Sequence, residues 1–201
     1  EQRKLDKLSA VAIWKEQIKI KFEVTISDAI SIWDPLNLSI VFFALKQIDL
    51  SLGGKTAAYN KGSIFYLAPK EAGSYSGWTS NKSITFYTSS NIPTQNVYHE
   101  YGHLLDNVFG DRITTALGAK AVYYDGEYLF GGKGVGYINS NTLKSMSLND
   151  PNWINPVDAL QHPSTDPSEQ WADIFANLIS GNIAHNGQGY TMWKWVFDNV
   201  H

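Results

Sequence analysis

The sequence predicts a domain of the α+β class. Segments whose apolar residues recur at helical spacing flank a central block of β-branched and aromatic runs. The chain has 201 residues, of which 43% are hydrophobic and 17% charged, so it is long enough to bury one sizeable core. We therefore expect a single domain over residues 1–201, built from an N-terminal lobe of about 1–108 and a C-terminal lobe of about 109–201.

The N-terminal half supplies helices and then strands. Apolar residues at helical spacing predict a helix over 4–19, and the alternation in IKIKFEVTI predicts a strand over 18–26. Asp34 followed by Pro35 is typical of a helix start, and the helix is expected to end before Gly53 and Gly54. The runs AAYNKGSIFYLAP and SITFYTSS predict strands over 57–69 and 83–90, with a turn-rich segment between them.

The C-terminal half contains the remaining elements. A helix is expected over 95–109, and a hairpin with a turn at Asp125 and Gly126 is expected in VYYDGEYLF. The segment DPSEQWADIFANLIS predicts a helix capped by Asp166 or Ser168, and YTMWKWVFDNV predicts a last one.

Charge and composition exclude several classes of function. The formal net charge of −3 provides no basic surface for nucleic acid and no polybasic patch for a membrane, and no apolar stretch reaches the roughly 20 residues of a spanning helix. We expect no nucleic-acid or membrane partner. The absence of cysteine means that any metal must be held by His, Asp or Glu. A composition rich in Asn, Ser, Thr, Tyr and Trp suits a secreted or cell-surface protein.

The segment HEYGH, residues 99–103, has the spacing of a zinc site. Positions i and i+4 of a helix lie one turn apart on nearly the same face, so His99 and His103 can reach one ion. Glu100 lies beside them, where a carboxylate can take a proton from a zinc-bound water. Apolar residues around the motif indicate a helix packed in a core, whereas a pair of surface histidines is the alternative interpretation.

A catalytic zinc usually has three protein ligands, so one more is needed. The pattern HExxHxxGxxH is excluded, because it would require glycine where Asp106 stands and histidine where Phe109 stands. An acid on another helix remains, and SEQWAD offers Glu169 and Asp173 at positions i and i+4.

HEYGH followed by Glu-x-x-x-Asp on a second helix resembles the gluzincin zinc metallopeptidases. The compact group of anthrax lethal factor and Pro-Pro endopeptidase is the more similar one, because its motif helix also carries an acid at the position of Asp106 in HEYGHLLD. The resemblance is specific over about 95–109 and 160–177. It implies that Glu169 is the third zinc ligand and that Asp173 orients a zinc histidine, for which His99 is the candidate.

Further site residues follow from the same resemblance. The group has a tyrosine seven residues before its ligand glutamate, and this chain has His162 there; a protonated histidine can also stabilise an oxyanion. Tyr190 is a rival oxyanion donor. Asp106 either hydrogen-bonds His103 or is a solvated residue at the end of an apolar turn.

The resemblance implies a zincin-like fold with a twisted sheet and the HExxH helix in the N-terminal lobe and a mainly helical C-terminal lobe. It also implies a zinc endopeptidase that binds Zn²⁺ and hydrolyses peptide bonds of an extended peptide or protein substrate. We expect a monomer. The substrate would pair with the edge of a sheet, and the strand over 83–90 is the candidate, with Trp78 and Trp153 near the specificity pockets. A zincin-fold binding module without turnover and a cell-wall amidase are the alternatives.

Overall fold

The computed structural model describes residues 2–70, 76–113, 121–124, 127–130, 138–139 and 167–181. The chain divides into two compact units, Glu1–Leu104 and Leu105–His201, and the boundary falls inside one helix, α4. Both units contain helices and strands, so the prediction of a mixed α+β protein is confirmed. None of the helices in these ranges is long and apolar enough to cross a membrane.

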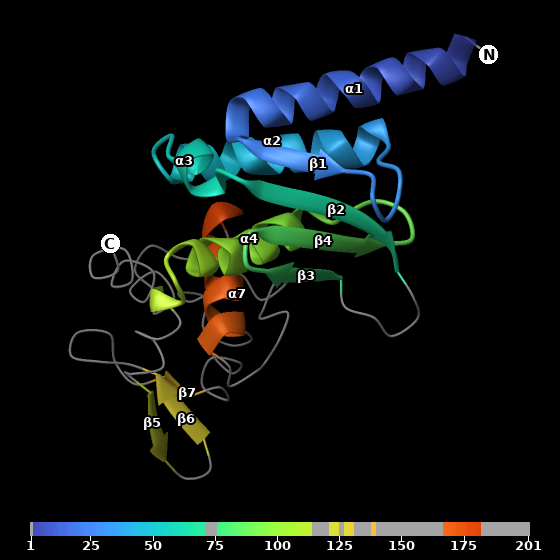
Figure 1. Ribbon diagram of the computed structural model, residues 1–201. Coiled ribbons are helices and arrows are strands. Elements are labelled where there is room, and N and C mark those ends of the chain that lie inside the picture. The colour runs from blue at the N-terminus through green and yellow to red at the C-terminus, as the bar shows by residue number, and fades with distance from the viewer. Residues whose placement is uncertain are drawn as a thin grey trace. The chain divides into compact units, whose positions relative to one another are not determined.

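The first unit is a sheet with helices (Figure 1). Its elements are α1 (Gln2–Phe22), β1 (Val24–Ser27), α2 (Pro35–Ser51), α3 (Thr56–Asn60), β2 (Ser63–Pro69), β3 (Gly77–Ser80), β4 (Ser83–Thr88) and most of α4 (Thr94–Val108). The strand order is β1-β2-β4-β3, with β3 antiparallel to β4 and the other pairs parallel. Figure 1 shows α1 and α2 near β1 and shows β3 at the opposite end of the sheet.

The sheet position of 83–90 differs from the prediction. This segment forms β4, which lies between β2 and β3 and therefore has no free edge. The end strands of the sheet among the described residues are β1 and β3. The prediction failed because β3 lies in the turn-rich segment, where glycine and serine give no strand pattern and pairing with β4 determines the structure.

One face of the sheet is buried. The side chains that alternate toward it are at most 9% exposed: Val24, Ile26, Phe65, Leu67, Ile84 and Phe86. Their neighbours on the other face, such as Thr25 and Trp78, are exposed, as the period of two along a strand requires. The core therefore lies on one side of the sheet.

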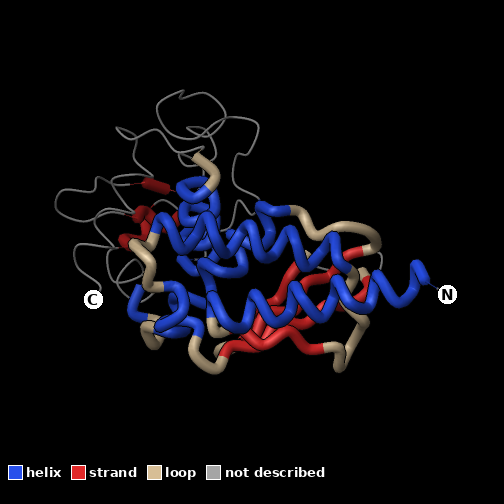
Figure 2. The backbone as a smooth tube through the Cα atoms, turned by 90° about the horizontal axis from the view of Figure 1, so that it is seen from above, coloured by secondary structure: helices blue, strands red, loops and turns tan. Residues whose placement is uncertain are grey.

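The helix α1 extends further than expected. Residues 18–22, predicted as the start of a strand, are helical. Ile18 and Phe22 are fully buried at positions i and i+4, while Ile20 is 70% exposed, so burial follows the helical period. Glu23, at φ 58°, separates α1 from β1. Figure 2 shows α1 beside the sheet; its contacts are with β1, α2 and α3.

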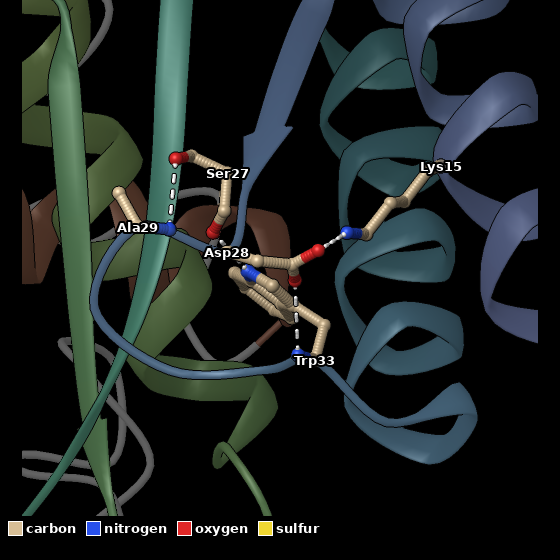
Figure 3. A network of polar contacts seen from close by, with 5 residues as sticks. All are labelled: Lys15, Ser27, Asp28, Ala29 and Trp33. Atoms are coloured by element: carbon tan, nitrogen blue, oxygen red, sulfur yellow. Dashed lines mark hydrogen bonds and ion pairs between the residues drawn. The ribbon is translucent and has the colours of Figure 1, made fainter. Parts of the chain in front are cut away.

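Polar contacts fix the start of α2. The carboxylate of Asp34 accepts hydrogen bonds from the backbone N–H groups of Leu36 and Asn37, which confirms the predicted cap with proline at the first helical position. Just before it, Asp28 pairs with Lys15 of α1 and accepts the Trp33 N–H at 3.3 Å, as Figure 3 shows. The indole of Trp33 donates to the Ser27 carbonyl at 2.9 Å. The loop between β1 and α2 is thus held at both ends.

Residues 57–60 form the end of α3, although their sequence pattern predicts a strand. The strand of that region begins only at Ser63, after Gly62 at φ 85°. A glycine with positive φ allows the chain to leave the helix in one step.

The second unit contains the end of α4, the strands β5 (Ala121–Tyr124), β6 (Glu127–Phe130) and β7 (Ile138–Asn139), and α7 (Pro167–Ile179). In β5 and β6 Tyr124 pairs with Glu127, which confirms the predicted hairpin with a two-residue connection. The helix predicted in DPSEQWADIFANLIS, residues 166–180, is also confirmed. The predicted final helix, together with Trp153, His162 and Tyr190, lies outside the described residues.

Candidate metal centre

The helix α4 presents its motif on one face and its apolar residues on the other. Four side chains are buried on the core face: Val97, Tyr101, Leu104 and Leu105. At about 100° per residue, this face lies on the far side of the helix from His99 and His103. Packing of the apolar face therefore fixes the direction in which the histidines point.

The two histidines converge. Their Nε2 atoms lie 3.2 Å apart, and their rings are nearly perpendicular at 81°. His99 is 4% exposed and His103 is half-buried. Two histidines that bind one metal ion must direct a ring nitrogen at the same point, because each imidazole offers its lone pair to the ion there.

Glu169 completes a group of three. Within the part of the chain that the structure describes, His99, His103 and Glu169 each offer one ligand atom, and these atoms all lie within 4.8 Å of one another. Two imidazoles and one carboxylate form a donor set that zinc accepts, with a position left for a further ligand. The group could hold a metal ion, and its members are the three predicted from the sequence.

The two acids of α7, Glu169 and Asp173, differ in how deeply they are buried. Glu169 lies in the first turn of the helix and is half-buried, whereas Asp173 is 1% exposed and lies among buried apolar side chains. A carboxylate this deeply buried needs polar or charged partners. Asp173 does not belong to the group of three, and its role as an orienter of a histidine stays a prediction.

The carboxylate of Glu100 on α4 is held by a residue of β3. It is 6% exposed, and its Oε2 atom accepts a hydrogen bond of 2.6 Å from the Thr79 hydroxyl of β3. Such a short distance between a hydroxyl oxygen and a carboxylate oxygen is typical of a charge-assisted hydrogen bond. No sequence pattern indicates this contact, because Thr79 lies in the segment predicted as turns.

Asp106 stabilises the end of α4. It is 3% exposed, its Oδ1 accepts the Ile113 N–H at 2.9 Å, and its carbonyl accepts the Asp111 N–H at 3.0 Å. The side chain is therefore not a solvated residue, which was one of its two interpretations. Its hydrogen bond to His103 stays a prediction.

Tyr101 anchors the core face of α4. Burial raises the pKa of its phenol well above the usual value, and the nearby Asp49 carboxylate acts in the same direction. The side chain is therefore neutral over the physiological pH range and serves as a packing residue near Thr56 and Asn60 of α3.

No protein-family model, curated protein or solved structure matches this chain.

Proposed function

We propose that the protein is a zinc-dependent endopeptidase. The observation that supports this most is the convergence of His99, His103 and Glu169 within 4.8 Å, with the buried carboxylate of Glu100 next to one of them in sequence. A purely structural zinc site has no use for an acid at that place, whereas hydrolysis needs a base there.

In this proposal, different residues bind the metal, transfer the proton and stabilise the oxyanion. His99, His103 and Glu169 would hold the ion, and zinc bound there would supply Lewis-acid polarisation of a carbonyl and would acidify water. Glu100 accepts the proton of the attacking water and delivers it to the leaving amine, which balances the hydrolysis of a peptide bond. His162 or Tyr190 is proposed as the donor to the oxyanion.

An extended peptide is the proposed substrate. The end strand β3 contacts Glu100 through the hydrogen bond from Thr79. An end strand can pair with a peptide through main-chain hydrogen bonds. This replaces the segment over 83–90 as the candidate for substrate pairing. The zincin-like fold, the secreted or cell-surface location and the monomeric state belong to the same proposal.

The test combines metal content with turnover. Wild type, Glu169→Ala and Glu100→Gln would be analysed for bound zinc and incubated with a mixed peptide library. We expect one zinc and cleavage for wild type, loss of zinc for Glu169→Ala, and retained zinc with a loss of turnover of about 100-fold or more for Glu100→Gln. Glu16→Ala, an exposed acid on α1, is the matched control and should resemble wild type.

Other outcomes identify the alternatives. Zinc without cleavage of any peptide would favour a binding module, and cleavage of peptidoglycan but not of peptides would favour an amidase. A wild type without zinc, or a Glu169→Ala variant that retains it fully, would overturn the ligand set.

A further inference from the structure

The carboxylate of Glu100 lies against two residues of β3. Thr79 Oγ1 lies 2.6 Å from Oε2 and 3.1 Å from the Glu100 carbonyl oxygen. The hydroxyl has a single proton, and the shorter contact, to a charged acceptor, is the one to which it is donated. Thr79 therefore ties one oxygen of Glu100 to the sheet.

Gly77 makes room for the same carboxylate. A Cβ atom at this position would lie 2.3 Å from Glu100 Oε1 and 2.5 Å from both Cδ and Cγ, far inside van der Waals contact. Any side chain at 77 would therefore displace Glu100 from its place. The need for glycine here is one of space, because of the close approach of Glu100 to the strand.

Both residues belong to one face of a fixed strand. Positions 77 and 79 are two apart, so they point to the same side of β3, while Trp78 and Ser80 point to the other. In the ladder with β4, Gly77 pairs with Phe86 and Thr79 with Ile84, and both partners are fully buried. The face that holds Glu100 is thus anchored in the core of the first unit.

We infer that Gly77 and Thr79 are positioning residues for the general base. The hydrogen bond from Thr79 and the space left by the missing side chain at Gly77 together hold the Glu100 carboxylate in a single orientation. This inference rests on the proposed function for its catalytic meaning. A glutamate that is already immobilised before substrate binds loses less side-chain freedom in the transition state, and a small misplacement of a base is costly in rate.

The kinetic test compares four variants. Thr79→Val removes the hydroxyl at nearly constant shape, and we expect kcat to fall about 10-fold to 100-fold with KM and zinc content unchanged. Thr79→Ser keeps the hydroxyl and should restore most of kcat. Gly77→Ala should lower kcat by displacing Glu100. Thr85→Val is the matched control, because Thr85 pairs with Trp78 on the opposite face and should have wild-type kcat.

A wild-type kcat in Thr79→Val overturns the inference. So does a Thr79→Ser variant as impaired as Thr79→Val, because the hydroxyl would then not be the group that matters. A loss of zinc in Thr79→Val would also contradict it, since Thr79 would then support the metal ligands and not the base.

A second measurement separates this inference from the proposed function. The free energy of unfolding of Thr79→Val, Glu100→Leu and the double variant forms a double-mutant cycle that needs no catalysis. We expect the effects to be non-additive, because both changes remove the same hydrogen bond. If wild type proves inactive, the proposed function fails, and an additive cycle would then overturn the contact itself.

Discussion

Asp28 is a single carboxylate that joins three parts of the first unit. It pairs with Lys15 of α1, accepts the Trp33 N–H, and follows directly on β1. Partial burial by itself raises the pKa of Asp28, but the hydrogen bonds from Lys15 and Trp33 and the positive charge of Lys15 outweigh it, so the net pKa lies below 3.8. Ionised Asp28 is therefore favoured by folding.

This shift predicts a dependence of stability on acid. Because the folded pKa is lowered, the contribution of Asp28 is present above pH 3.8 and is lost as pH falls through the folded pKa. Asp28 is half-exposed, so we expect the contribution to be below about 1 kcal/mol. Denaturant unfolding between pH 2 and 6 should show wild type and Asp28→Asn differing above pH 4 and converging below it. A constant difference across this range would contradict the prediction.

Glu100 and Thr79 differ in how far the sequence predicts their roles. The acid could be identified from its place in HEYGH, since the motif is local. Its hydrogen-bond donor could not, because Thr79 precedes it by 21 residues and no spacing rule connects the two. The hydrogen-bond partner on β3 can be identified only once the pairing of β3 with β4 is known.

Among the elements, α4 is the one on which the site depends, and its entry is fixed by a residue of α2. The amide of Asn37 is 1% exposed, and its Nδ2 donates to the Ser90 carbonyl at 3.1 Å. Its Oδ1 accepts the Ile92 N–H at 2.7 Å. The segment that leads into Thr94 is therefore anchored two residues before α4 begins.

We predict that Asn37→Ala lowers the free energy of unfolding by about 2–3 kcal/mol, because the buried Ile92 N–H loses its acceptor. Asn91→Ala removes an exposed amide from the same loop and should change stability by less than about 0.5 kcal/mol. Chemical denaturation of both variants beside wild type measures the two values. Equal values for the two variants would show that the hydrogen bonds of Asn37 do not stabilise the loop.

The ends of α1 and β3 show what element prediction misses. Residues 18–22 alternate apolar and charged side chains, which suits a strand, yet Ile18 and Phe22 are buried by helical spacing and Ile20 is not. The residues of β3 have weak strand preference and form a strand because β4 offers a partner. In both places tertiary packing outweighs the local pattern.

For the whole molecule, the proposed zinc would connect two helices that are distant in sequence. His103 and Glu169 are 66 residues apart, the difference of their positions, and lie on α4 and α7. An ion that binds only the folded arrangement stabilises it by mass action. Metal removal should therefore be visible in thermal unfolding as well as in activity.

At free zinc of about 100 times the Kd, we expect a stabilisation of about 2.7 kcal/mol, which corresponds to a rise in Tm of about 5–10 °C. A chelator should reverse the rise. Glu169→Ala should lose this zinc-dependent shift, whereas the Glu16→Ala control should keep it. The same Tm for wild type with zinc and with chelator would contradict the prediction.

The features that depend on near neighbours could be predicted from the amino-acid sequence. The helical spacing of HEYGH, the cap of α2 at Asp34, the hairpin of β5 and β6 and the helix of α7 all follow from interactions within a few residues. The folded structure was needed to identify the strand at the edge of the sheet and the residues that contact Glu100. Such features depend on pairing between distant segments, and the free energy of that pairing comes from burial and hydrogen bonds that no local pattern records.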